Sequence, residues 1–131
     1  MRVDRLIGTD FLIDRWRNGE SSDASAYARA HLDDSLAIPW IVKAEFLNLA
    51  GIVGQDSLRV QEFLARYPTH WPDEDLLAGY ARLNVLLRLR GLSLRAYDLW
   101  LAASALRLDV PLVTRNSREL GTVPGIKLDP F

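Results

Sequence analysis

The stretch from residue 97 to residue 120 constrains the fold most strongly, because it combines a helix with a buried strand. Apolar side chains recur in its first half at helical spacing, and Asp98 places a carboxylate in the first turn, where the helix dipole favours an acid. The apolar run 110–113 is typical of a buried parallel strand. Asn116 follows that strand, and ligands of open α/β sheets collect beyond the carboxyl ends of strands. The segment therefore predicts an α/β protein with a functional edge near Asn116.

Short apolar strands and helices alternate along the rest of the chain as well. We predict strands at residues 6–8, 36–39, 110–113 and 126–128, and helices at residues 10–18, 21–32, 41–53, 57–66, 73–90 and 98–109. The segment 67–72 is either a loop or a brief edge strand. The expected N-terminal caps are Asp10, Ser22, Asp56 and the acidic run 73–75. Such alternation predicts a parallel sheet that helices flank on both faces.

Composition narrows the classes of function that remain. The chain has 131 residues, enough for one domain, 1–131, that buries about two-thirds of its unfolded surface. It has no cysteine, which excludes disulfides and thiolate metal sites, and 16 basic against 17 acidic side chains give no overall positive field for nucleic acid. No apolar run is long enough to span a membrane, and charges interrupt the N-terminus too early for a signal peptide. We therefore expect a soluble cytoplasmic domain with no membrane partner.

Acidic residues stand where this fold would present side chains at its strand ends. Asp10 follows the first strand, Asp98 opens a helix, and Glu45 lies on the apolar face of helix 41–53. A glutamate on a core face costs free energy unless a cation or a functional site needs it, although Glu45 could instead lean to solvent at the edge of that face. Gathered carboxylates repel one another, and a divalent cation such as Mg²⁺ or Mn²⁺ relieves the repulsion. Neither histidine has a partner at metal-ligand spacing and no glycine-rich phosphate loop is present, so zinc and nucleotide sites are not expected.

The order of these motifs resembles that of the PIN-domain nucleases, and within them the VapC-type toxins of toxin–antitoxin pairs. The resemblance covers nearly the whole chain and rests on Asp10 and the segments 42–46, 98–106, 112–120 and 123–126. It implies a PIN-like three-layer α/β/α sandwich with a short central parallel sheet of about four to five strands. It also implies a toxin that acts as a ribonuclease and is paired with a cognate antitoxin protein.

The resemblance matches single residues to the family pattern, with one departure. Glu45 matches the acid on the helix after the second strand, Asp98 matches the acid that opens the helix before the last main strand, and Asn116 stands where the family has Asp or Asn. Gly8 occupies the position of the family's metal-binding aspartate, and Asp10 follows two residues later. Residues two apart on a strand project to one side, so Asp10 can turn its carboxylate toward the metal. The alternative is that Asp10 only caps the helix and the site has lost a ligand.

The implied reaction is hydrolysis of RNA phosphodiester bonds with Mg²⁺ or Mn²⁺ as the cofactor. The metal ligands that the resemblance implies are Asp10, Glu45 and Asp98. Asn116 would complete the catalytic set by orienting a water molecule. The implied substrate contacts, of which the arginine suits bidentate phosphate binding, are Thr9, Thr114 and Arg115. The alternative function is an RNA- or protein-binding module in which cleavage is weakened or lost through Gly8.

Large apolar side chains predict a surface for a partner. Trp16, with Phe11, Leu12 and the following helix, could form part of a groove, and by the resemblance its occupant would be an antitoxin laid across the active site. Trp100 is either a core residue or a homodimer contact, because aromatic side chains are common in both settings. A two-fold homodimer is the assembly that the resemblance implies.

Overall fold

Five parallel strands form the centre of the computed structural model, which describes residues 1–131. The strands are β1 Arg5–Ile7, β2 Leu36–Pro39, β3 Thr69–His70, β4 Leu112–Val113 and β5 Leu128–Asp129. Their order across the sheet is β3-β2-β1-β4-β5, and every neighbouring pair is parallel. The chain order therefore reverses at β1, which has β2 on one side and β4 on the other. The carboxyl ends of β1 and β4 flank the topological switch point, where open α/β sheets bind ligands.

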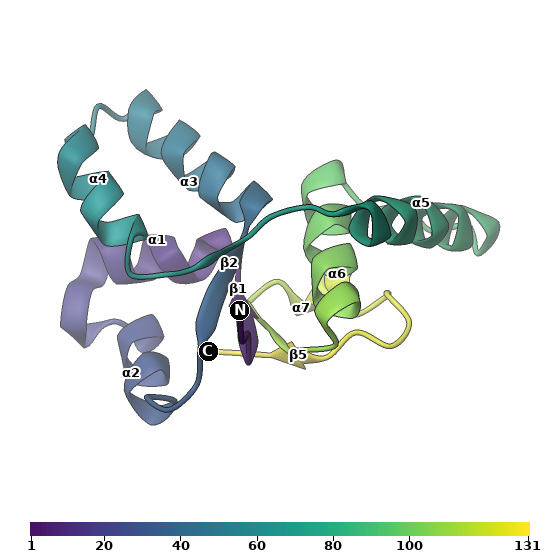
Figure 1. Ribbon diagram of the computed structural model, residues 1–131, viewed down its shortest axis with the longest axis horizontal. Helices are drawn as coiled ribbons and strands as arrows, with labels where there is room; N and C mark the ends of the chain where they lie inside the picture. Colours follow the sequence, from purple (N-terminus) through teal and green to yellow (C-terminus); the bar gives the residue numbers. More distant parts are fainter.

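Helices cover both faces of this sheet (Figure 1). They are α1 Thr9–Asn18, α2 Asp23–Ala30, α3 Trp40–Ile52, α4 Ser57–Leu64, α5 Glu74–Leu89, α6 Ala96–Leu108 and α7 Ser117–Leu120, with a 3₁₀ helix, η1 Gly19–Ser21, between α1 and α2. In Figure 1, α1 to α4 lie to the left of the strands, whereas α5 and α6 lie to the right. The two groups form the outer layers of an α/β/α sandwich, which confirms the predicted fold class.

The strands are apolar on both faces because both faces are covered. The strand residues without exposed surface include Leu6, Ile7, Ala37, Ile38, Leu112 and Val113. Continuous apolar runs of this kind are the sequence signature of a parallel sheet buried on both sides. Phe11 and Leu12 are also fully buried, so they belong to the core. They cannot line a surface groove, which corrects the expectation for these two residues.

The helix starts follow the predicted caps at three places and depart from them at one. The side chains of Ser22, Asp56 and Asp73 each accept a hydrogen bond from a backbone N–H in the first turn of α2, α4 and α5. The N-cap of α1 is Gly8, which has no side chain to offer, and Asp10 lies inside the first turn. The predicted cap at Asp10 is therefore wrong. Its carboxylate instead reaches across to the end of β4.

Tertiary packing answers one question that the sequence left open and gives the surroundings of Trp100, which is half-buried. The segment 67–72 contains a short edge strand, β3, which pairs with β2. Trp100 packs within the molecule, because its ring stacks on Tyr80 at 3.8 Å and meets Trp40 edge-on at 5.4 Å. The short helix α7 has no counterpart among the predicted elements, since its four residues are too few for a periodic signal. None of the helices combines the length and hydropathy that crossing a bilayer requires.

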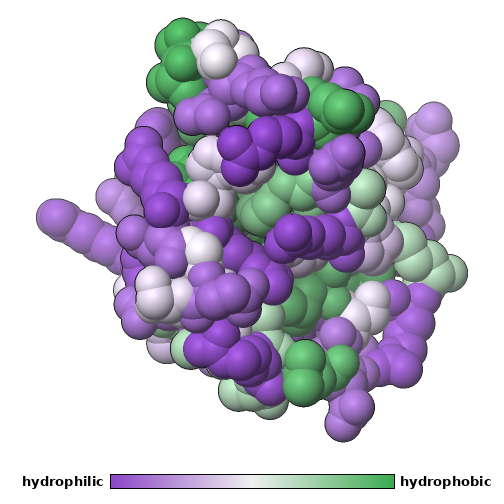
Figure 2. All heavy atoms as spheres, turned by 90° about the vertical axis from the view of Figure 1, so that its left-hand side faces the viewer, coloured by the Kyte–Doolittle hydropathy of each residue, from purple (hydrophilic) through white to green (hydrophobic).

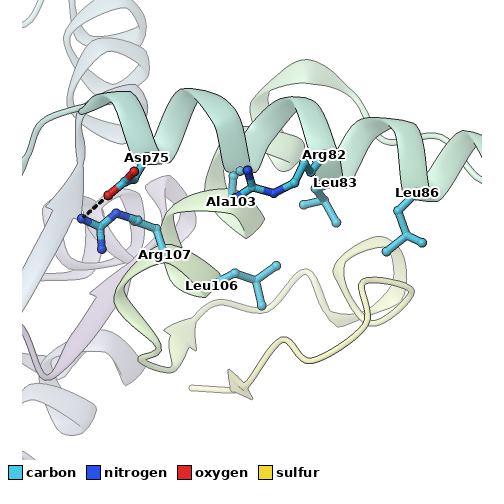
Figure 3. A pocket seen from close by; sticks show the side chains of 8 residues that line it. Asp75, Arg82, Leu83, Leu86, Ala103, Leu106 and Arg107 are labelled. Carbon is cyan, nitrogen blue, oxygen red and sulfur yellow. Dashed lines mark ion pairs between the residues drawn. The ribbon is translucent and has the colours of Figure 1, made fainter.

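A cavity of about 380 Å³ remains between α5 and α6 (Figure 3). Leu83 and Leu86 of α5 lie on one side of it. Arg107 near the end of α6 closes one side through ion pairs with Asp73 at 3.0 Å and Asp75 at 3.6 Å. These pairs tie the end of α6 to the start of α5.

Candidate active site

A cavity of about 250 Å³ opens at the switch point, beside the carboxyl ends of β1 and β4. The residues that line it are Gly8, Thr9, Asp10, Ile13, Glu45, Arg95, Tyr97, Asp98, Leu101, Thr114 and Asn116. They come from the start of α1, from α3, from the start of α6 and from the segment after β4. Of the predicted site residues, only Arg115 is missing from this set. The fold therefore gathers into one cavity side chains that lie far apart in the sequence.

Gly8 makes room for the carboxylate of Asp10. A Cβ atom on Gly8 would lie 2.8 Å from Oδ1 of Asp10, which is closer than a carbon and an oxygen atom approach without displacement. The backbone of Gly8 is extended, with φ −85° and ψ 173°, so any residue could adopt this conformation. The small size of glycine, and not its backbone freedom, is what this position uses. The Asp10 carboxylate thus lies in the space that a side chain at position 8 would need.

Three donors hold the Asp10 carboxylate in this place. Oδ2 accepts from the Thr114 hydroxyl at 2.9 Å and from the Arg115 backbone N–H at 2.7 Å, and Oδ1 accepts from the Phe11 backbone N–H at 2.9 Å. The bonds to Oδ2 join the start of α1 to the end of β4, 104 positions later in the chain. A carboxylate offers about four acceptor positions, so Asp10 keeps acceptor capacity for a further partner. Hydrogen bonds from outer donors commonly fix the orientation of metal-binding carboxylates in this way.

Glu45 is oriented by a buried chain of hydroxyl groups. The Thr9 hydroxyl donates to Oε2 of Glu45 at 3.1 Å, and the Tyr97 hydroxyl makes a short hydrogen bond with that same Thr9 hydroxyl. A threonine hydroxyl has one proton, so Tyr97 must be the donor in the second bond. Burial raises the pKa of Tyr97, and the nearby Glu45 charge raises it further. The phenol therefore stays protonated and keeps its role as a donor.

Asp98 is the most enclosed acid of the cavity. Its side chain is only 3% exposed, and it lies in the first turn of α6. Oδ1 accepts from the side-chain amide of Asn116 at 3.4 Å, a long hydrogen bond. Oδ2 lies 3.5 Å from Nε of Arg95, whose own side chain is 81% exposed. Asp98 is thus positioned by a residue after β4 and faces a single, loosely placed guanidinium.

The donor chemistry of the cavity fits a hard divalent cation. Glu45, Asp98 and Asn116 line it with carboxylate and carboxamide oxygen donors, and Asp10 adds a third carboxylate. Oxygen donors of this kind suit Mg²⁺ and Mn²⁺. No three acidic or histidine side chains stand close enough together, as the side chains lie, to form one ligand cluster. Binding of a shared ion would therefore require these side chains to rotate within the cavity.

Arg115 lies outside the cavity, and only its backbone reaches the site. Its guanidinium pairs with Asp23 at 2.8 Å and lies 3.6 Å from Asp14, and it stacks over the Phe131 ring at 4.2 Å. The backbone N–H, by contrast, donates to Asp10. The structure therefore does not bring the Arg115 side chain together with the other predicted site residues.

Two polar side chains of the cavity were not among those predicted from the sequence. Tyr97 and Arg95 both precede Asp98 at the start of α6. The spacing of Arg95 and Asp98, three residues apart, was the available signal, because side chains at that spacing lie on one helix face. No local pattern indicated Tyr97, since its partner Thr9 is 88 positions away.

Comparison with known proteins places the chain in a family. The PIN domain matches residues 6–124. Ribonuclease VapC1 from Haemophilus influenzae (strain R2866) is 25% identical over 127 residues, which cover 93% of this chain and 93% of that protein. The structure of VapBC-1 from nontypeable Haemophilus influenzae has a TM-score of 0.81 at 23% identity, and DNA-bound VapBC from Salmonella typhimurium has 0.84 at 18%, each covering 98% of both chains. These two structures share the fold. By the match over residues 6–124, this chain belongs to the PIN domain family.

Proposed function

We propose that this protein is a Mg²⁺- or Mn²⁺-dependent ribonuclease and the toxin of a toxin–antitoxin pair. The observation that carries the proposal is the cavity at the switch point, which collects Asp10, Glu45, Asp98 and Asn116. The PIN domain match and the likeness to a ribonuclease named VapC1 support the same reaction class. The cytoplasm, where RNA is available, is the compartment in which such an enzyme would act.

In this proposal Glu45, Asp98 and Asp10 would hold the cation. The bound ion would supply Lewis-acid stabilisation of the phosphate and a lowered pKa of water. Tyr97 and Thr9 keep Glu45 in a fixed orientation through their hydroxyl chain. Asn116 holds Asp98 through its side-chain amide and would orient the attacking water. Thr114 holds Asp10 against the end of β4, so both strand ends contribute to one site.

The space at Gly8 supports a role for Asp10 in place of the missing first acid. The carboxylate fills the volume beside Gly8, and it does so with acceptor capacity to spare. The glycine at position 8, where the family has an aspartate, and the acid at position 10 therefore act together. We propose that Asp10 supplies the carboxylate that the family pattern places two residues earlier.

The proposed antitoxin would occupy an apolar groove between α1 and the end of α3. This groove, of about 510 Å³, is lined mainly by Ile13, Trp16, Phe46, Leu49, Ala50, Ile52 and Val53. Figure 2 looks onto the side of α1 to α4 and shows apolar side chains recessed between polar ones. Ile13 lines both the groove and the active-site cavity, so a segment bound in the groove would reach the site. The VapBC complexes with this fold support a protein partner.

A second apolar surface, on α5, would join two copies of the chain. Leu77, Val85 and Leu89 are 45%, 55% and 81% exposed along this helix. Exposed leucine and valine side chains on one long helix are typical of a surface that packs against another protein. We propose a two-fold homodimer through α5, and sedimentation velocity of Leu89→Glu against the wild type would test it. A dimer that persists unchanged in this variant would exclude the α5 surface.

The test of the proposed function combines metal binding with RNA cleavage. Mn²⁺ titration by calorimetry and cleavage of a structured RNA would compare the wild type with Asp98→Asn, Asp10→Asn and the control Asp33→Asn, an exposed acid outside the cavity. We expect Asp98→Asn and Asp10→Asn to lose metal binding and cleavage, whereas Asp33→Asn keeps both. Cleavage that survives in Asp98→Asn would refute the assignment of the site.

Two observations favour a second candidate function, a binding module without cleavage. Asp10 already accepts three hydrogen bonds from the protein, and no three acids form a ready ligand cluster. A wild-type protein that binds RNA or antitoxin, but neither binds Mn²⁺ nor cuts RNA, would establish this second function in place of the first.

A further inference from the structure

Arg95 is the only basic side chain that lines the active-site cavity. The other ionisable groups there are three carboxylates and the phenol of Tyr97. A negatively charged cavity repels the phosphates of RNA, so a substrate contact in it needs a local cation. The net charge of −1 gives the whole chain no field that could replace such a contact.

The position of Arg95 leaves its guanidinium free for another anion. Its side chain is 81% exposed at the mouth of the cavity, directly before the first residue of α6. Nε lies 3.5 Å from Asp98, which exceeds the about 2.7–2.9 Å of a charge-assisted hydrogen bond. No other carboxylate lies within ion-pair distance of it, in contrast to Arg115, whose guanidinium pairs with Asp23 and Asp14. Arg95 is therefore placed at the site but weakly held.

We propose that Arg95 binds an RNA phosphate at the mouth of the active site, which rests on the proposed ribonuclease function. A guanidinium offers planar, paired N–H donors that match two phosphate oxygens. The same geometry makes Arg95 and a divalent cation compete for the carboxylate of Asp98. Removing the Arg95 charge should therefore weaken RNA binding without weakening metal binding. Arg95 would thus make the phosphate contact that the sequence analysis expected of Arg115.

The first experiment measures RNA binding without cleavage. All variants would carry Glu45→Gln and be studied in a chelator, with a short fluorescein-labelled single-stranded RNA of mixed sequence and fluorescence anisotropy over a range of salt concentrations. The slope of log K against log salt is negative, and one lost phosphate contact reduces its magnitude by about 0.7 for single strands. We expect Arg95→Gln to show this decrease and Arg95→Lys to keep the slope. Arg90→Gln, an exposed arginine at the end of α5 that lines no part of the cavity, should match the parent protein.

The second experiment separates a substrate contact from a structural role. Mn²⁺ calorimetry would compare Arg95→Gln with the wild-type chain, and we expect metal affinity at least equal to that of the wild type. An unchanged salt slope would overturn the proposal, and so would a slope change accompanied by weaker Mn²⁺ binding, which indicates a distorted site. Failure of the ribonuclease function looks different, because the wild type would then neither bind Mn²⁺ nor cut RNA while the salt slope still depended on Arg95.

Discussion

Replacing Gly8 by alanine tests whether the glycine exists to admit the carboxylate of Asp10. The new methyl group would lie 2.8 Å from Oδ1 of Asp10, and the carboxylate is the part that can move. Because the carboxylate moves as one group, its displacement should break one of the hydrogen bonds that Oδ2 accepts from Thr114 and the Arg115 N–H. Loss of one such bond to a charged group costs about 1.5–3 kcal/mol. Alanine also lowers the conformational entropy of the unfolded chain, which stabilises the fold by about 0.4–1 kcal/mol. This gain applies because alanine can adopt the extended backbone at position 8.

The expected net result is a loss of about 0.5–2.6 kcal/mol in the free energy of unfolding. Urea denaturation, followed by circular dichroism, would measure it in the wild type and in an Asp10→Ala background. Without the carboxylate, the nearest atoms to the new methyl group belong to Thr114 at 3.7 and 3.8 Å, which is ordinary contact. Gly8→Ala should then be neutral or stabilising, so the sign of its effect should reverse between the two backgrounds.

Gly51→Ala is the matched control for this experiment. Gly51 lies in α3, and a Cβ there meets no atom within 4 Å. Alanine should stabilise the helix by up to about 1 kcal/mol in both backgrounds. If Gly8→Ala costs the same with and without Asp10, the carboxylate is not what the glycine accommodates. The explanation that Asp10 uses the space left by Gly8 would then be refuted.

Three further predictions concern other parts of the molecule. Tyr97→Phe removes the donor that fixes Thr9 and Glu45, so we expect Mn²⁺ affinity measured by calorimetry to fall about tenfold or more. Burial lowers the pKa of His70 below its ordinary 6.5, so the unfolded chain binds the proton more readily. Stability should therefore fall as the pH drops from about 6.5 toward the folded-state pKa, and His70→Gln should lose this part of the pH dependence of urea unfolding. Val53→Asp, on the 67% exposed Val53 of the groove, should fold normally and bind the cognate antitoxin more weakly in a pull-down titration.

Each of these predictions has an outcome that contradicts it. Mn²⁺ binding that is unchanged in Tyr97→Phe would mean that the hydroxyl chain does not position Glu45. A pH profile of unfolding that is the same in His70→Gln would assign the acid sensitivity to other groups. Antitoxin affinity that is unchanged in Val53→Asp would place the partner elsewhere on the surface.

Most of the architecture was predictable because its signals are local. The strands β1, β2 and β4 are apolar runs, and the helices α3, α5 and α6 show helical spacing of apolar residues that survives in any context. The edge strand β3 and the short helix α7 escaped clear prediction, because two- and four-residue elements depend on the neighbours that they contact. The cap at Asp10 failed for a related reason, since its carboxylate finds two donors at the end of β4.

The sequence by itself indicated most of the acidic and polar residues that meet at the strand ends. Asp10, Asp98 and Asn116 follow or precede buried elements, and the parallel order of the strands carries their ends to one edge. Only the tertiary structure decided what each side chain does there. In the tertiary structure the Asp10 carboxylate lies in the space beside Gly8, the Arg115 guanidinium pairs with Asp23, and Arg95 lies at the cavity mouth. The physical reason is that these roles depend on contacts between residues up to 105 positions apart, whose geometry no local pattern encodes.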